Sequence, residues 1–219
     1  MTGPNGRIWS VSAARRGEVT VERSSDIRVE RTRALLLEAL VRLMRDRDAA
    51  QVSVAQLTRT AQVNRSTFYA HYVDIFDFLD TETQRLVDGL IETVGPNDSN
   101  PHEDGPQYLR FFEYVRDNAP LFQAMLGPHG YYRFREYMEE RGRITYERLI
   151  GPGGLKGMGA ITADSLAMYI VTAHMGIIKW WLDDGLVYTA DSMARLLDRL
   201  TVKGVLASVG MAEEEWIPS

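Results

Sequence analysis

The stretch from Ser53 to Tyr72, SVAQLTRTAQVNRSTFYAHY, constrains the fold more than any other part of this 219-residue chain. Ser53 is a residue type that caps helix N-termini, and Gln56 three residues later completes the pattern of a capping box. We expect a first short helix from this point, a three-residue turn, and a second helix capped by Asn64. The stretch therefore predicts a helix-turn-helix arrangement.

The side chains of this stretch divide into an inner and an outer set. Leu57, Val63 and Phe68 are spaced to meet in a small core, because the second helix must lie across the first. The outer set is polar, and its members are Asn64, Arg65, Ser66, Thr67, Tyr69 and His71. Such donors and acceptors suit base edges and phosphates, so we expect a DNA-binding surface here.

The polar residues can each be given an expected role on DNA. Base contacts are expected at the start of the second helix, from Arg65, Ser66 and Thr67. Phosphate contacts are expected from Ser53, Tyr69 and His71. Asn64 is expected to cap the second helix at the edge of the same surface.

The distribution of charge favours nucleic acid, although the net charge of −5 does not. Residues 1–72 hold 12 Arg and 7 acidic residues, a net charge of +5, and residues 73–219 hold the other 13 basic and 23 acidic residues. Every basic residue in the first part is Arg, which suits bidentate contacts with phosphate and guanine. A basic end on an acidic body can dock on DNA in one orientation, whereas chance scatter of charges on solvated faces is the alternative.

The segment VNRSTFYAHY resembles the recognition-helix signature of the TetR family of bacterial transcription regulators, in the branch that reads N-R-S-T-F-Y-x-H-F. The resemblance is close from Arg31 to about Leu79 and covers the remainder only by architecture. Gln62 stands where the family often has Gly, so the turn could differ slightly. Ile75 stands where the family often has Lys, so we expect a common phosphate contact to be missing.

This resemblance implies how such a protein works. Members dimerise through a four-helix bundle made by their last two long helices and bind a near-palindromic operator. A small molecule bound in the helical body moves the helix that begins here at Asp74, and repression is relieved.

The pattern of apolar residues predicts an all-α protein. The resemblance implies an N-terminal three-helix DNA-binding domain and a helical C-terminal domain for ligand binding and dimerisation. Residues 1–27 show no helical or strand period and are expected to form a flexible arm. Residues 28–73 are expected to form the helix-turn-helix domain, and residues 74–219 the helical body. Helices of the body are expected near 74–94, 107–118, 120–126, 131–149, 163–184 and from 189 onward.

The helix expected over 163–184 is apolar on nearly all sides and must therefore be covered on several sides. One side can pack on the same subunit, and another is expected to meet a second copy together with the last helix. The expected dimer residues are Ala173, Gly176, Ile177, Trp180, Met193, Leu197 and Leu200.

Aromatic and thioether side chains are concentrated on the middle helices of the body. An apolar lining with a few polar tips is typical of small-molecule sites. The resemblance implies an effector site among these helices, so a small apolar or aromatic effector is expected. The candidate residues are Tyr108, Phe112, Phe122, Met125, Phe134, Tyr137, Met138 and His174. For any one of them an ordinary place in the core is the alternative, and a hydrogen-bonded core histidine is the alternative for His174.

The sequence contains no motif that indicates catalysis or metal binding. It has no Cys, no metal-binding His pair, no nucleophile motif and no phosphate-binding loop in the glycine run over 151–160, so no enzyme, metal or cofactor is expected. The start lacks the apolar region of a signal peptide, and the most apolar run, 166–182, is short for a membrane span, so we expect a cytoplasmic protein without membrane contact. Two alternatives stay open: a regulator whose body only dimerises or contacts protein, and a helical enzyme or carrier with an incidental motif.

Overall fold

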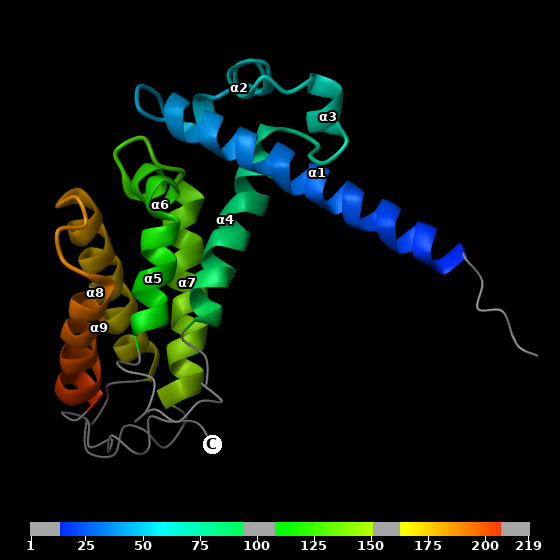
Figure 1. Cartoon of the computed structure of the whole chain (residues 1–219). Helices are drawn as coiled ribbons and strands as arrows, with labels where there is room; N and C mark the ends of the chain where they lie inside the picture. The colour runs from blue at the N-terminus through cyan, green and yellow to red at the C-terminus, as the bar shows by residue number, and fades with distance from the viewer. Residues whose placement is uncertain (1–13, 94–107, 151–162, 207–219) are drawn as a thin grey trace, which may run out of the picture.

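The computed structural model describes residues 14–93, 108–150 and 163–206, and these ranges contain helices and no strand. Side chains are described for residues 27–93, 108–148 and 163–201 and for Gly204. The helices are α1 (Ala14–Leu43), α2 (Val54–Ala61), α3 (Arg65–Tyr69), α4 (Ile75–Glu92), α5 (Leu109–Asp117), α6 (Ala119–Leu126), α7 (Tyr132–Ile150), α8 (Ala163–Asp183) and α9 (Ala190–Asp198). A 3-10 turn, η1 (Ala49–Gln51), precedes α2, and a π-helix, η2 (Arg199–Leu206), continues α9. The expected all-α architecture is confirmed (Figure 1).

The helices α1, α2 and α3 form a small head at one end of the molecule (Figure 1). Leu36 and Leu40 of α1 are fully buried, as are Leu57 of α2 and Phe68 of α3. Val63, in the turn between α2 and α3, is partly buried against the same apolar core. The three residues expected to meet between the two short helices therefore do share one core.

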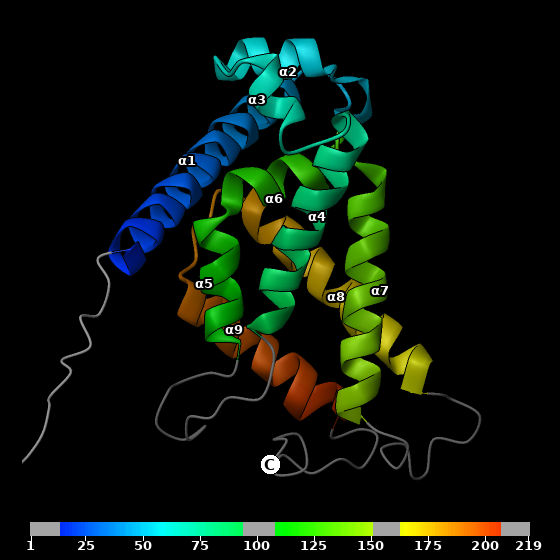
Figure 2. The same cartoon turned by 90° about the vertical axis from the view of Figure 1, so that its right-hand side faces the viewer.

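The first helix begins earlier than the sequence pattern indicated. Residues 14–27, expected to belong to a flexible arm, lie in α1, and residues 1–13 fall outside the described part. Figures 1 and 2 show this half of α1 projecting from the head without a neighbouring helix. A helical segment without a neighbouring helix needs no apolar period. A helix already formed over 28–43 extends at the cost of ordering one residue for each hydrogen bond gained.

The helix α4 joins the head to the body and runs between α5 and α7 (Figure 2). Its N-cap is Asp74, as expected, and its apolar stripe is buried at Ile75, Phe78, Leu79, Leu86 and Leu90. The head and body also meet where the amide of Ala49 donates to the carbonyl of His129, at 3.0 Å. Nδ1 of His129 lies 2.8 Å from a carboxylate oxygen of Asp48 beside this contact.

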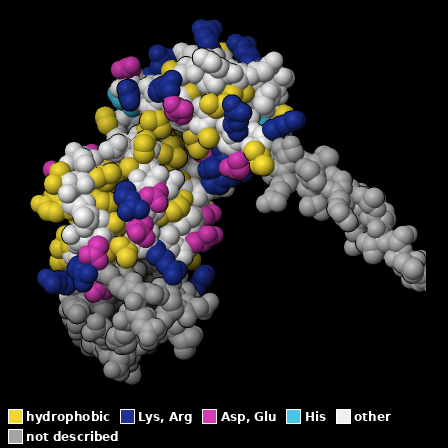
Figure 3. Space-filling view, in the orientation of Figure 1, with side chains coloured by type: hydrophobic (Ala, Val, Ile, Leu, Met, Phe, Trp, Pro, Cys, Tyr) yellow, Lys and Arg dark blue, Asp and Glu magenta, His cyan; other side chains and the backbone are white. Residues whose placement is uncertain are grey.

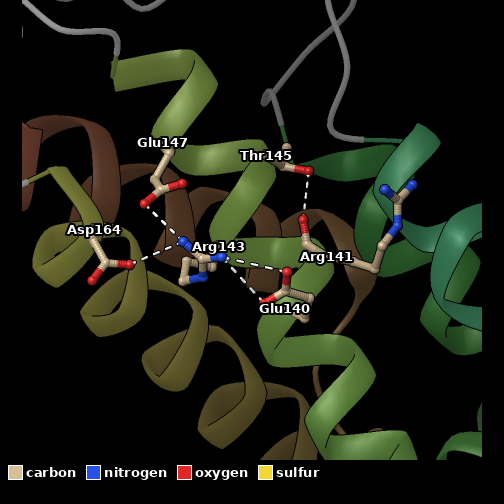
Figure 4. Close-up of polar contacts among 6 residues, drawn as sticks. All are labelled: Glu140, Arg141, Arg143, Thr145, Glu147 and Asp164. Atoms are coloured by element: carbon tan, nitrogen blue, oxygen red, sulfur yellow. Dashed lines mark hydrogen bonds and ion pairs between the residues drawn. The ribbon is translucent and has the colours of Figure 1, made fainter.

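The helix α8 packs along α7 and against α6, while α9 packs against α5. Arg143 of α7 bonds to Glu147 of its own helix at 2.9 Å and to Asp164 at the start of α8 at 3.1 Å, as Figure 4 shows. Its other terminal nitrogen bonds to Glu140. None of the described helices is long and apolar enough to cross a membrane.

Candidate nucleic-acid interface

The start of α2 is fixed by Ser53 and Gln56, which bond to each other's backbone. The hydroxyl of Ser53 accepts from the amide of Gln56 at 3.3 Å, and the side-chain oxygen of Gln56 accepts from the amide of Ser53 at 3.0 Å. The expected capping box is therefore confirmed. Ser53 remains exposed at the surface of the head.

The turn between α2 and α3 reaches a left-handed backbone without glycine. Gln62 has φ 56° and ψ 34°, and the following amide, of Val63, donates to the carbonyl of Thr58 at 2.9 Å. A left-handed conformation costs a non-glycine residue roughly 1–2 kcal/mol. Gln62 thus takes the conformation for which Gly is the usual residue, and the hydrogen bond that closes the turn is present.

The cap of the short helix α3 and its buried Phe68 ring fix which side of the helix faces the core. The side-chain oxygen of Asn64 accepts from the amide of Ser66 at 3.0 Å. Phe68 is fully buried, with its ring centroid 5.5 Å from that of Tyr69 and 5.3 Å from that of Tyr72. With Phe68 pointing inward, the opposite face of α3 must point to solvent.

Most of the residues expected to contact DNA are exposed. Asn64, Arg65, Ser66, Tyr69 and His71 are exposed together with Ser53, while Thr67 is half-buried. The exposed fraction of Tyr69 is 56%, which leaves its hydroxyl and ring edge accessible beside Arg65, one helical turn earlier.

The stretch that contains this face carries no acidic side chain. Residues 49–73 contain no Asp or Glu, although they contain Arg59 and Arg65. Both guanidinium groups are exposed, and neither has an ion-pair partner among the described residues. Figure 3 shows Arg side chains spread over the head, with some acidic side chains among them. A stretch without acidic residues and with unpaired guanidinium groups is suited to a polyanion.

At the start of α4, backbone amides that could bind an anion are already bonded to carboxylates. Asp74 accepts from the amides of Phe76 and Asp77 at 2.8 and 2.9 Å, and the carboxylate of Asp77 accepts from the amide of Val73 at 2.7 Å. Ile75 is buried. These amides are therefore already satisfied, and two carboxylates stand where a phosphate would approach, which supports the expectation that this contact is missing.

In the body, most of the expected effector residues are packed as core. The fully or nearly fully buried ones are Tyr108, Phe112, Phe122, Met125, Phe134, Met138 and His174. Their rings meet edge to face, for example Phe122 with Phe134 at 6.0 Å between centroids. Tyr137 is half-buried, and its hydroxyl lies 3.3 Å from a carboxylate oxygen of Asp88. The seven buried residues are therefore packed as an ordinary core, which was the alternative to an effector site.

A polar network lies within this core. Nδ1 of His174 is 3.0 Å from the hydroxyl of Tyr146, and Nε2 is 2.9 Å from the hydroxyl of Thr201 in η2. Tyr108 extends the network, with its hydroxyl 3.5 Å from that of Tyr146. Burial lowers the pKa of His174 to about 3 and raises the pKa of Tyr146 well above its ordinary value. His174 is therefore neutral at pH 7 and hydrogen-bonded on both nitrogens.

The expected dimer residues divide between the surface and the core. Gly176, Trp180 and Leu200 are exposed, and Ala173 and Ile177 are partly exposed beside them. A Cβ built on Gly176 would meet nothing within 4 Å, so the surface is open there.

Met193 and Leu197 do not belong to this exposed set. They are 2% and 1% exposed, because they face the core of their own subunit, where α9 packs against α5. Their side chains are thus not part of the apolar surface that one subunit exposes, and their expected role in a dimer interface stays a prediction. Leu196 of α9 and Leu200 of η2 are 42% and 49% exposed instead.

Sequence reasoning missed Glu82, which is fully buried in α4. It is bonded to Arg33 and Tyr72 of the head. A signal was present, because residue 82 falls at helical spacing on the apolar stripe of Phe78, Leu79 and Leu86. A carboxylate at such a position requires buried partners.

Comparison with known proteins places this geometry in context. Residues 105–203 match the family model TetR_C_8, described as a transcriptional regulator C-terminal region. The uncharacterized HTH-type transcriptional regulator YxbF of Bacillus subtilis (strain 168) is 33% identical over 210 residues, which make up 89% of this chain and 51% of that protein. The chain thus spans about half the length of the curated relative it matches.

Solved structures share the fold at low sequence identity. A TetR-family transcriptional regulator from Streptomyces coelicolor aligns with a TM-score of 0.55 and 17% identity, over 85% of each chain. A TetR transcriptional regulator from Streptococcus agalactiae 2603V aligns with a TM-score of 0.53 and 21% identity, over 82% of this chain and 98% of that one. These likenesses show that the chain shares the fold of TetR-family transcriptional regulators.

Proposed function

We propose that this chain is a TetR-family transcription regulator whose helix α3 reads an operator in the major groove of DNA. The observation that carries the proposal is the fixed outward face of α3. Burial of Phe68 and the Asn64 cap hold Arg65 and Ser66 at the surface, inside a stretch without acidic residues. Such a face can approach phosphates without repulsion and present donors to base edges.

The proposed roles follow from exposure and from which groups are already bonded. Arg65, unpaired and exposed, contacts guanine through its two terminal nitrogens. Ser66 and the half-buried Thr67 complete the base contacts. Ser53, Tyr69 and His71 contact phosphates at the rim. The side-chain oxygen of Asn64 is engaged by the amide of Ser66, which leaves its amide nitrogen for DNA.

The regulator acts as a homodimer on a near-palindromic operator. Tyr169, Trp180 and Leu200 leave large apolar groups exposed on α8 and η2, at 60%, 49% and 49%. A second copy related by a two-fold axis would cover these groups and place two heads side by side. Recognition helices should then lie about 34–36 Å apart, one turn of DNA. Such a regulator acts in the cytoplasm, where bacterial DNA lies.

A small apolar or aromatic effector releases the operator and so relieves repression. One observation favours a site in the body over a body that only dimerises. The hydroxyl of Thr83, in the α4 segment between α5 and α7, is buried and has no hydrogen-bond partner among the described residues. A ligand with one polar group would satisfy this hydroxyl while its apolar part displaced or spread the surrounding aromatic side chains.

The DNA part of the proposal is tested by selecting duplexes with the purified protein from a random pool. The protein should enrich one near-palindromic sequence and bind it at least about a thousandfold more tightly than a scrambled duplex at physiological salt. Binding to both duplexes should weaken as salt rises. Failure to enrich any sequence would contradict the proposal.

The effector part is tested with a library of small aromatic and apolar molecules. A true effector should raise the melting temperature of the protein and release the selected duplex, because it binds the DNA-free arrangement more tightly. Thr83→Val keeps the side-chain shape and should weaken that release while preserving DNA binding. If no compound separates protein from DNA, the body serves only dimerisation or protein contacts.

A further inference from the structure

The carboxylate of Glu82 is the one fully buried acidic group among the described residues, and it joins α4 to the head. One oxygen accepts from Nε of Arg33 in α1 at 2.7 Å. The other accepts from the hydroxyl of Tyr72 at 2.8 Å and lies 3.5 Å from a nitrogen of Arg85. A carboxylate removed from water is stable only while such donors surround it, so displacing any one of them is costly.

Tyr72 connects this carboxylate to the DNA-reading helix. Its amide donates to the carbonyl of Phe68 at 3.0 Å, and its ring centroid is 5.3 Å from that of Phe68. On the other side, its ring meets Phe78 of α4 at 4.9 Å. Burial, followed by the charge of Glu82, raises the pKa of Tyr72, so its hydroxyl stays a donor at neutral pH.

Arg33 supplies the second link, from α1. Burial would lower its pKa, but the charge of Glu82 and the hydrogen bond to it outweigh burial, and the pKa is raised. A permanently charged guanidinium thus faces the buried carboxylate. One side chain of α4 therefore holds both the helix that braces the head and the segment that ends α3.

Two further carboxylates of α4 bond to side chains of the body. Asp80 accepts from the hydroxyl of Tyr131 at 2.8 Å, and Asp88 accepts from Nε of Arg141 at 2.8 Å. With about 100° between successive helical residues, Glu82 lies about 200° from Asp80 and about 120° from Asp88 around the helix. Asp80 and Asp88 are 31% and 40% exposed, whereas Glu82 is 0% exposed. Of the three, only Glu82 has no access to water as a replacement partner.

We propose that Glu82 is a positioning residue for DNA recognition, which fixes the direction of α3 relative to α4 through Tyr72 and Arg33. This inference rests on the proposed function, because the direction of α3 sets how two heads fit successive half-sites. Loosening this contact lets α3 adopt several directions, so the dimer should lose its preference for one half-site spacing. Contacts of a single head with phosphates should change little.

The test uses Tyr72→Phe, which removes the hydroxyl and keeps the ring, and Glu82→Gln, which keeps the shape and removes the charge. Tyr131→Phe is the matched control, since it removes a hydroxyl that donates to Asp80 on the body side of α4. Binding is measured to the selected duplex, to a scrambled duplex, and to a duplex with one base pair inserted between the half-sites. Hydrogen exchange of the amides over 65–72 is measured in the free protein.

We expect Tyr72→Phe to weaken binding to the selected duplex about tenfold, the usual scale for a lost hydrogen bond to a buried charge. The preference over the inserted duplex should shrink, binding to the scrambled duplex should be unchanged, and exchange over 65–72 should quicken. The control should leave all four readouts as in the wild type. Glu82→Gln should act in the same direction as Tyr72→Phe.

The inference is overturned if Tyr72→Phe keeps wild-type spacing preference and wild-type exchange over 65–72. It is also overturned if both variants only lower the melting temperature and weaken all three duplexes equally. A wild-type protein that prefers no duplex would instead contradict the proposed function. In that case the exchange data still decide whether Tyr72 and Glu82 hold α3 in place.

Discussion

Nδ1 of His174 lies 3.0 Å from the hydroxyl of Tyr146, and this pair forms the centre of a polar network inside an otherwise apolar body. Nε2 of the same ring lies 2.9 Å from the hydroxyl of Thr201. A neutral imidazole has one donor and one acceptor nitrogen, so one hydroxyl donates to the ring and the other accepts from it. Protonation would turn both nitrogens into donors and leave a buried charge.

This arrangement predicts a loss of stability in mild acid. The pKa of His174 is about 3 in the folded protein and about 6.5 in the unfolded chain. Between these values the unfolded chain binds more protons, so the free energy of unfolding falls as the pH is lowered, by about 1.4 kcal/mol per pH unit. Above about pH 6.5 His174 contributes no slope.

Urea unfolding from about pH 8 to about pH 5 measures this slope. His174→Gln removes the titrating group and serves as the comparison, because all other groups titrate alike in both proteins. The wild type should lose stability below about pH 6.5 more steeply than the variant. Equal slopes would show that His174 does not titrate as its burial requires.

The cap of α3 predicts a measurable cost when its acceptor is lost. Asn64→Ala leaves the amide of Ser66 without its partner, which should cost about 1 kcal/mol of stability. Asn64→Asp keeps the acceptor but adds a negative charge at the DNA surface. Chemical unfolding should therefore show a loss for the alanine variant only, whereas both variants should bind DNA more weakly. Equal stability of the alanine variant and the wild type would contradict the capping role.

The open surface at Gly176 predicts a variant that separates folding from assembly. Gly176→Glu should fold normally, because nothing lies within 4 Å of the added Cβ. In a dimer packed over this face, the new carboxylate would be buried without a partner, and association should fail. Sedimentation at micromolar concentration should show a monomer for Gly176→Glu and a dimer for the wild type. Gln84→Glu, on the exposed side of α4, adds the same charge and should remain dimeric.

The helix-turn-helix was predictable because its determinants are local. Ser53 with Gln56 and Asn64 with Ser66 are pairs at most three residues apart, and Phe68 falls at the helical spacing that a shared core requires. Such short-range pairs can be read directly from a sequence. The caps, the turn and the outward residues follow from them.

The features that were missed depend on distant parts of the chain. Glu82 is stabilised by Arg33, 49 residues away, and no local pattern pairs them. Whether Met193 faces its own subunit or a partner depends on how α9 packs on α5, which periodicity does not decide. The early start of α1 at Ala14 left no apolar period to detect, since no other helix runs beside that part of α1.

The central claim is that α3 reads DNA bases through Arg65. The most direct measurement is the affinity of the wild type and Arg65→Ala for the selected duplex and for duplexes with each base pair replaced in turn. Arg135→Ala removes an exposed arginine from α7, in the body, and is the matched control.

The account predicts that Arg65→Ala loses about 1–3 kcal/mol of binding free energy and becomes indifferent to one guanine position in each half-site, while Arg135→Ala binds as the wild type. If Arg65→Ala keeps both the affinity and the base preferences of the wild type, then Arg65 does not read bases and the assignment of α3 is contradicted.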